Sequence, residues 1–372
     1  MRRPPISKMR KQLCGSPDVG GRVDIPAFSL PPELVSEIFL HCLPRHPDLP
    51  PVTGLESPFT LSHICRKWRE IALSTPALWR GISVTLDGCR GGRRELDLLK
   101  TYLSRSGCMP LSIRLNCGAL ADVHGREDAS PFAAPFVNAI ALRSDRLEHL
   151  SLCLPIRSLP ALPGPLPSLK SLTLACYEPG AQDAEACLTR SFLSAPLLRR
   201  VTLSERYREM YKPILPWSQL TALVVDLTTL AECTMFLGMA PNLIYCRLTV
   251  LVRHAPVGAV TLPHLQTLCL NVQAPKFAPT GLGDFITSLT LPALTRLQIS
   301  SFFLFPASSP TTLITNLVSR SRCNLEELWI HDAPTSSGAE AQWRAALPSL
   351  SSVVLGKRDR QFGKIWDGEG AD

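Results

Sequence analysis

The sequence predicts an α/β protein in which a short N-terminal group of three helices precedes a solenoid with a parallel, concave sheet. The first observation is a Leu-x-x-Leu-x-Leu pattern that recurs from residue 147 to near the C-terminal end. The second is its spacing, because successive units start 22 to 31 residues apart, which is the range of stacked repeats. Strands of a β-sandwich, the alternative architecture, recur about every 8 to 12 residues. The third observation is an apolar helical pattern that begins at Leu30.

The recurring units have the period of leucine-rich repeats, with some irregular members. In each unit the final Leu-x-Leu places two side chains on one face of a short strand, and the first Leu packs from the preceding turn. One unit cannot bury that face alone, so neighbouring units must stack. The nine units begin at Leu147, Leu169, Leu198, Leu220, Leu243, Leu265, Leu294, Leu325 and Leu350.

Two earlier segments, 82–86 and 111–115, are degenerate units, and the apolar spacing of Leu96, Leu99 and Leu103 predicts a helix between them. The predicted solenoid therefore spans residues 83–356. A proline shortly before the first Leu of most units suits the entrance of a strand, because its φ is fixed and it has no donor. These prolines are Pro167, Pro196, Pro216, Pro241, Pro263, Pro292 and Pro348.

The residues that flank the buried leucines are expected to be exposed on the concave sheet, the usual binding surface of such a fold. Arg, Tyr and Trp are enriched in binding hot spots, so five of these residues are the candidate target-binding patch: Arg200, Tyr245, Arg247, Arg296 and Trp329. Its arginines suggest an acidic or phosphorylated target. An ordinary solvated sheet face stays open as the alternative. The rest of the expected exposed set is His149, Ser151, Thr202, Val224, Asp226, Thr267, Asn271, Gln298, Glu327 and His331.

The chain before the repeats predicts a helical module over residues 25–82. Pro31 and Pro32 suit the first turn of a helix, and Pro44 ends the pattern. The apolar residues of this helix cover about half of its circumference, whereas one small core needs a stripe of about 100°. The excess suggests a second apolar partner. The apolar residues are Leu34, Val35, Ile38, Phe39, Cys42 and Leu43.

A second helix is expected to begin with Ser57 as its N-cap and to continue to Ala72. Its apolar residues Leu61, Ile64, Trp68 and Ile71 follow helical spacing. The pair Thr75-Pro76 then predicts a short third helical turn, through Trp79. The stretch 44–54 between the first two helices is rich in proline, and we expect it to be a surface loop.

The helical module resembles an F-box. The resemblance rests on Leu30-Pro-Pro-Glu-Leu34 with Ile38-Phe39, on Leu61-Ser-His-Ile-Cys-Arg-Lys-Trp68 with Arg69-Glu-Ile-Ala72, and on Thr75-Pro-Ala-Leu-Trp79. It is especially similar to the F-box-like family of mushroom-forming fungi, in which irregular leucine-rich repeats commonly follow. The motif covers about 55 residues, and the loop 44–54 is longer than in a minimal F-box.

The resemblance implies a non-catalytic role. F-box modules dock on the Skp-type adaptor of a Skp, cullin and F-box ubiquitin ligase, while the repeats select the target protein. Carried over position by position, the adaptor-binding residues are Leu30, Pro31, Leu34, Ile38 and Phe39, supported by Ile64, Trp68 and Ile71. Two alternatives stay open: a helical cap on the first repeat, and a leucine-rich scaffold that acts without ubiquitin transfer.

Composition excludes several other classes. No run approaches the roughly 18 apolar residues that a membrane span requires. The 13 cysteines form no C-x-x-C pair, and no signal peptide is evident, so we expect apolar fillers in a reducing compartment, the cytosol or the nucleus. The pairs His41-Cys42 and His63/Cys65 match no zinc spacing. No Gly-x-Ser-x-Gly, His-Glu-x-x-His or Walker motif is present, so neither an enzyme nor a cofactor is expected.

The net charge of +8 is partly local, because residues 1–24 hold six basic and two acidic residues. We expect a disordered basic arm there; a nucleic-acid contact, an anionic lipid, an import receptor and a weak mitochondrial presequence are the alternatives. No RNA-binding signature supports the nucleic-acid alternative. The charged tail 357–372 carries no net charge and gives no hint of a partner.

Overall fold

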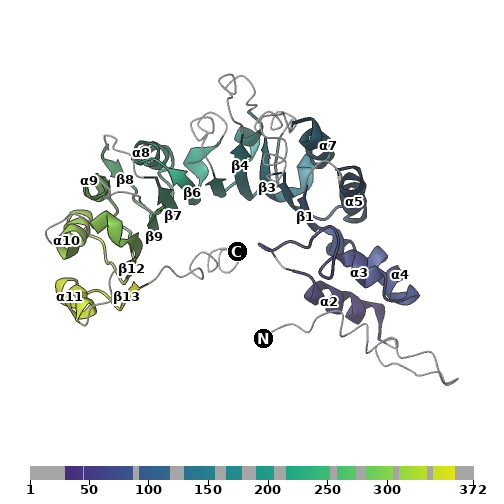
Figure 1. Cartoon of the computed structure of the whole chain (residues 1–372), viewed down its shortest axis with the longest axis horizontal. Helices are drawn as coiled ribbons and strands as arrows, with labels where there is room; N and C mark the ends of the chain where they lie inside the picture. Colours follow the sequence, from purple (N-terminus) through teal and green to yellow (C-terminus); the bar gives the residue numbers. More distant parts are fainter. Residues whose placement is uncertain are drawn as a thin grey trace. The chain divides into compact units, whose positions relative to one another are not determined.

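The computed structural model describes residues 30–44, 46–86, 92–117, 130–155, 165–177, 190–204, 215–251, 258–273, 281–304, 310–332 and 338–356. The predicted arm 1–24 and tail 357–372 lie outside these residues. The protein has the expected α/β class, and its largest sheet contains 11 parallel strands. It divides into two compact units, which meet in the sequence between residues 162 and 163. Figure 1 labels the elements of both units.

The first unit contains the helical module and three strands. Its α-helices are α2 (Pro32–Cys42), α3 (Pro58–Ser62), α4 (Arg66–Ser74), α5 (Gly92–Arg105) and α7 (Ser130–Ala141). Its 3-10 helices are η2 (Pro76–Trp79) and η3 (Ser144–Arg146). Its strands are β1 (Gly81–Thr85), β2 (Leu111–Asn116) and β3 (Leu147–Pro155), and β2 pairs with the other two in parallel. The predicted strand, helix and strand of residues 82–115 are therefore confirmed.

The second predicted helix is wrong in one respect, because it is broken into α3 and α4. Ser57 caps α3 as expected, since its side chain accepts a hydrogen bond from the Phe59 amide. The break follows Ser62, whose carbonyl accepts a hydrogen bond from Arg69 Nε instead of continuing the helix. Cys65 then caps α4 with its sulfur, which accepts from the Trp68 amide at 3.4 Å.

The proline-rich stretch 44–54 is not the simple surface loop that we expected. Pro51 forms a bridge with Ser83 of β1, and the Ser83 amide donates to the Pro50 carbonyl at 2.8 Å. The hydroxyl of Tyr102, on α5, donates to the Pro51 carbonyl, and Ser57 Oγ donates to Val52 O. The stretch thus covers the open edge of β1, which would otherwise present unpaired backbone groups. Spacing alone does not reveal a pairing between a proline-rich stretch and a strand.

The second unit contains the remaining repeats. Its main strands are β4 (Ser171–Tyr177), β5 (Arg200–Ser204), β6 (Ala222–Thr228), β7 (Tyr245–Val250), β9 (Thr267–Val272), β11 (Arg296–Ser300), β12 (Glu327–His331) and β13 (Ser352–Gly356). Each pairs in parallel with the next main strand. The short strands β8 (Val260–Thr261) and β10 (Leu289–Thr290) pair with each other.

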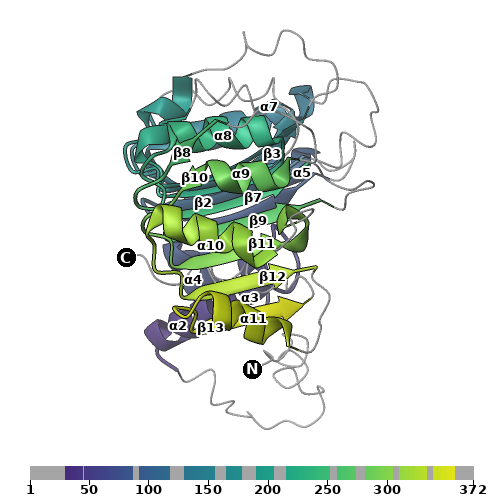
Figure 2. The same cartoon turned by 90° about the vertical axis from the view of Figure 1, so that its left-hand side faces the viewer.

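The helices of the second unit lie on one side of these strands. The α-helices are α8 (Leu230–Met239), α9 (Leu282–Ser288), α10 (Pro310–Ser321) and α11 (Ala339–Ala346). The 3-10 helices are η6 (Arg190–Ser194), η8 (Trp217–Gln219) and η9 (Ser301–Leu304). Figure 2 shows α8 to α11 one after another in front of the strands of their unit. No α-helix in the described part of this unit lies on the opposite face, which we call the helix-free face.

The first leucine of every unit is buried, as the pattern predicts. In six repeats of the second unit, a proline stands at the second position of a tight turn. The backbone amide of the first leucine of the repeat closes that turn. In one such turn, Ala240-Pro-Asn-Leu243, the Leu243 amide donates to the Ala240 carbonyl at 3.4 Å. Proline suits this position because its φ is already that of a turn. Pro216 is the exception, since it lies one residue before the corresponding turn.

Within the second unit, a backbone carbonyl joins each repeat to the next. The carbonyl of the residue after the first leucine accepts two amides of the following unit; Thr221 O accepts from Ile244 N at 2.8 Å and from Tyr245 N at 3.0 Å. A carbonyl oxygen has two lone pairs and can accept both. The same arrangement recurs at the carbonyls of Lys170, Arg199, Thr221, Ile244, Gln266, Thr295 and Glu326. We call these the entrance carbonyls.

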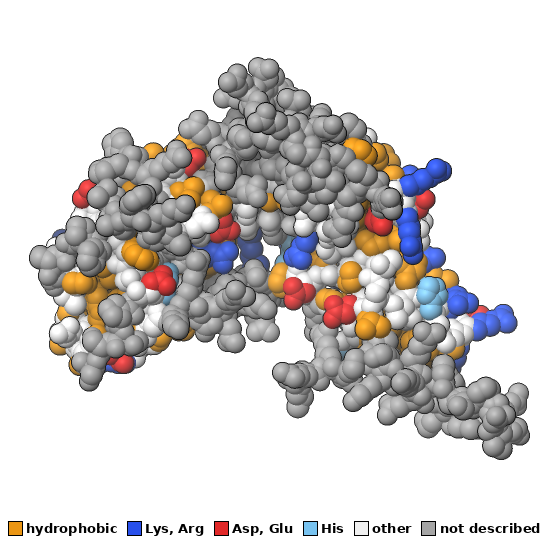
Figure 3. Space-filling view, in the orientation of Figure 1, with side chains coloured by type: hydrophobic (Ala, Val, Ile, Leu, Met, Phe, Trp, Pro, Cys, Tyr) orange, Lys and Arg blue, Asp and Glu red, His pale blue; other side chains and the backbone are white. Residues whose placement is uncertain are grey.

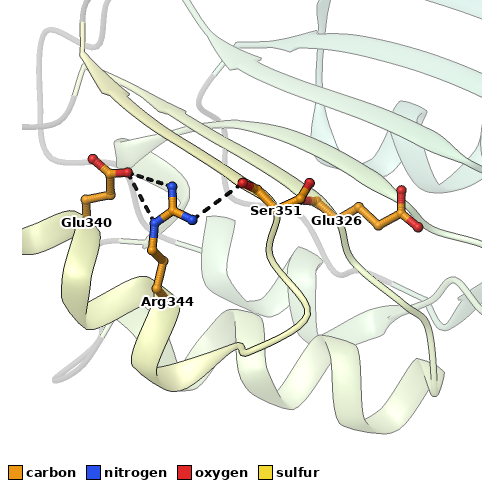
Figure 4. A network of polar contacts seen from close by, with 4 residues as sticks. All are labelled: Glu326, Glu340, Arg344 and Ser351. Carbon is orange, nitrogen blue, oxygen red and sulfur yellow. Dashed lines mark hydrogen bonds and ion pairs between the residues drawn. The ribbon is translucent and has the colours of Figure 1, made fainter.

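Side chains reinforce the last of these steps (Figure 4). Ser351 Oγ also donates to the entrance carbonyl of Glu326, at 3.0 Å. Arg344 on α11 donates to the Ser351 carbonyl and pairs with Glu340 at 2.8 Å. The pair is exposed and contributes little by itself. Its guanidinium nevertheless links α11 to the entrance of β13.

Leu197 and Leu198 test the role of the first leucine. Leu198 is fully buried, whereas its neighbour in the same turn is 46% exposed. We expect Leu198→Ala to lower the free energy of unfolding by about 2–5 kcal/mol, because it leaves a cavity. Leu197→Ala should change it by no more than about 0.5 kcal/mol. Urea denaturation followed by circular dichroism measures both, and equal losses would contradict the assignment.

Candidate functional site

The first candidate surface is the exposed side of α2. Leu34 is 52% exposed and Ile38 is 38% exposed, and the two stand one helical turn apart. Residues four apart lie on the same side of a helix, so their side chains form one apolar patch. In the space-filling view, hydrophobic side chains reach the surface of the helical module (Figure 3).

The opposite side of α2 holds the helix in the module. Val35 and Phe39 are buried, and the Phe39 ring meets the Trp68 ring edge to face with 5.1 Å between centroids. Ser36 Oγ and Thr75 Oγ1 lie 3.1 Å apart and share a hydrogen bond. The wide apolar arc therefore serves two purposes: half of it packs inside the module, and half stays exposed.

The eight residues carried over as adaptor-binding fall into two groups. Leu34, Ile38 and Pro31 are exposed, and Leu30 and Ile64 are partly buried. Phe39, Trp68 and Ile71 are buried, so the structure gives them a packing role and leaves their side chains out of reach of a docked protein. The sequence could not separate the groups, because both have helical spacing.

Two features near α2 were not predicted. Leu73 on α4 is 40% exposed although it follows the buried Ala72. A cavity of about 420 Å³ lies between α2, η2 and β1, with Leu40, Leu43 and Leu78 among its lining residues. Leu40 is the apolar residue that falls outside the arc of the other apolar residues of α2. The helix therefore has apolar side chains in three directions.

The second candidate surface is the helix-free face of the second unit. Strand pairing places Arg200, Tyr245 and Arg296 in one row across the strands, with Ala222 and Thr267 between them. The row two residues further along the strands contains Arg247 and Trp329, separated by Cys269 and Gln298. The five predicted patch residues thus lie on one face, in two adjacent rows.

The charges of the patch are partly compensated. Arg296 Nε lies 3.3 Å from Glu327 Oε1 on the neighbouring strand, and both side chains are partly exposed. Arg200 and Arg247 have no such ion pair within the described part of the chain. Of the three predicted arginines, Arg296 is therefore the least available to an acidic target, because part of its charge is already neutralised.

The expectation that all flanking residues are exposed is wrong for Tyr245, Thr267, Asn271 and His331, which are buried. Neighbouring strands are only about 4.8 Å apart, so long side chains cover shorter ones. Tyr245 and Cys269 illustrate this, because the hydroxyl donates a hydrogen bond to the sulfur. Burial raises the pKa of the Tyr245 hydroxyl and raises that of the Cys269 thiol to about 11.

Two other kinds of feature are absent from the described part of the chain, a cluster of metal ligands and a membrane-spanning helix. Among these residues, no three His, Cys, Asp or Glu side chains are grouped as metal ligands, and no helix is long and apolar enough to cross a membrane. Neither a protein-family model nor a curated protein matches the chain. The two surfaces are therefore the features from which a function is argued.

Native-state alkylation tests the burial of two cysteines, Cys246 on β7 and Cys269 on β9. Burial raises the pKa of both Cys246 and Cys269, so at pH 8 nearly all of each thiol is protonated and unreactive. We expect iodoacetamide to modify them at least about tenfold more slowly than the exposed Cys108. Peptide mass spectrometry measures the rates. In guanidinium chloride the difference should disappear, and equal rates in the native protein would contradict the burial.

Proposed function

We propose that this protein is the substrate-recognition subunit of a ubiquitin ligase of the Skp, cullin and F-box type. In this proposal the helical module binds a Skp-type adaptor and, through it, a cullin. The helix-free face of the leucine-rich repeats binds the target protein. The protein itself performs no catalysis, and it acts in the cytoplasm or the nucleus.

The observation that carries the proposal is the exposed pair Leu34 and Ile38. A helix that served only its own module would bury such residues, since burying each Leu or Ile side chain contributes about 1.5–3 kcal/mol. Leaving two of them exposed on a helix fixed by Phe39 and Trp68 suits a docking surface. The sequence resemblance to an F-box supplies the kind of partner.

The repeats support the second half of the proposal. Their helix-free face has Arg200, Arg247 and Trp329 in adjacent rows, and Arg and Trp are enriched in binding hot spots, whereas the predicted Tyr245 is buried. The uncompensated arginines favour an acidic or phosphorylated target.

A leucine-rich scaffold without ubiquitin transfer is the second candidate. It is favoured by the pairing of residues 50–52 with β1, which gives the N-terminal region a capping role that needs no adaptor. The two candidates differ in the exposed side of α2, which the scaffold does not use.

The double variant Leu34→Asp, Ile38→Asp separates the candidates. Two carboxylates in the apolar patch should abolish co-purification with a Skp-type adaptor, because they cannot be desolvated there. Both side chains are exposed, so circular dichroism should show retained folding. Leu142→Asp is the matched control, because Leu142 is 79% exposed on the same unit.

The control variant should bind the adaptor like the native chain. If the native chain forms no complex, the scaffold is the better account. If the double variant binds as well as the control, the adaptor does not dock on α2.

A further inference from the structure

Two polar side chains on the helix-free face lack hydrogen-bond partners within the described chain. Arg247 Nε and Asn271 Oδ1 are both shielded from solvent and accept or donate no hydrogen bond. Asn271 is only 5% exposed. Buried polar atoms are nearly always hydrogen-bonded, so two such atoms close together on one face need an explanation.

The two residues are diagonal neighbours on adjacent strands. Arg247 on β7 pairs with Cys269, and Thr249 on β7 pairs with Asn271 on β9. Side chains at such diagonal positions are about 7–8 Å apart at their bases, which is within reach of a long side chain. Because side chains alternate along a strand, both stand on the face that α8 and α9 do not cover.

The surrounding groups are engaged elsewhere. Asp226, the nearest carboxylate on β6, accepts a hydrogen bond from Thr249 Oγ1 at 3.0 Å, and no ion pair in the described chain joins it to Arg247. The Tyr245 hydroxyl donates to Cys269. Among the described residues Arg247 therefore has no anionic partner, unlike Arg296, which faces Glu327.

We propose that Arg247 binds an acidic segment of the target protein. The guanidinium has only donors and takes an anionic side-chain oxygen of the target, from a carboxylate or a phosphate. Asn271 borders this position on β9 and, at 5% exposed, is too buried to contact the segment itself. This inference rests on the proposed function, because it assigns the chemistry by which the target is recognised.

Arg247 is accessible enough for this role. It is only partly buried, and Nε is its one nitrogen that is shielded from solvent without a partner. On the β6 side its row neighbour is Val224 and the row beyond holds Ala222, so short side chains separate it from Arg200. An extended segment that crosses these strands would contact the short side chains of Ala222 and Val224, with Arg200 on one side and Arg247 on the other.

The test uses three peptides that share one sequence, acetyl-Gly-Ala-X-Ala-Gly-amide, in which X is Ser, Glu or phosphoserine. Binding to the full chain is followed by the ¹⁵N resonances of arginine Nε, assigned through the variant Arg247→Gln. We expect the Glu or phosphoserine peptide to shift the Arg247 signal in a saturable manner, and the Ser peptide to leave it unchanged. The anion that binds more tightly identifies a carboxylate or a phosphate as the source.

The variants decide whether the site is specific. We expect Arg247→Gln to weaken binding at least about tenfold, and Asn271→Ala, which removes a buried side chain, to change it less than about twofold. Arg247→Lys should retain part of the binding, because it keeps the charge. Arg296→Gln is the matched control: it removes one positive charge from the same face and should change binding less than about twofold.

Equal losses in Arg247→Gln and Arg296→Gln would overturn the proposal, because they would indicate general electrostatic attraction. So would unchanged binding in Arg247→Gln. Adaptor co-purification is run on the same variants. If that complex persists while no peptide shifts Arg247, this inference fails alone; if the native chain binds the peptide but no adaptor, the proposed function fails alone.

Discussion

The second unit depends on one backbone group in each repeat, the entrance carbonyl. It accepts the two amides that open the next strand, at distances of 2.8 to 3.2 Å along the whole unit. One of these amides precedes the strand and the other belongs to its first residue, as Ile244 and Tyr245 do at β7, and both would otherwise lack partners. The adjacent first leucine is buried, so the same turn satisfies the backbone and fills the core. Side-chain rows on the helix-free face follow from this constraint, because a slip of one residue would exchange the two faces.

Strand positions, the burial of the first leucines and the turn prolines could be predicted because they depend on local pattern. A Leu-x-Leu pair has strand periodicity, and a proline with its φ preset to a turn angle gives the same turn in six of the repeats. The break at residues 63–65 could not be predicted, because it involves a side-chain hydrogen bond from Arg69 that the apolar spacing does not reveal. The pairing of residues 50–52 with β1 could not be predicted either, because Ser83 is distant in the sequence. Strand alternation puts the five patch residues on the helix-free face, but the burial of Tyr245 and the pairing of Arg296 with Glu327 depend on the register between strands.

The helical module illustrates the limit of the apolar arc as evidence. The sequence pattern predicted a helix with more apolar positions than one small core needs, and a second apolar partner stays a prediction. Only the packing shows that Phe39 belongs inside, against Trp68, and that Leu34 and Ile38 stay outside. The resemblance to an F-box treats all three alike. Because Leu34 and Ile38 are exposed and Phe39 is buried, the first two can be substituted without disturbing the core of the module.

Hydrogen–deuterium exchange of the chain, alone and with a Skp-type adaptor, tests the central claim most directly. Docking shields backbone amides near the contact and leaves distant ones unchanged. The account predicts slower exchange over residues 31–42, on α2, and no change over β7 to β13. Unchanged exchange over α2, or protection confined to the strands, would contradict it.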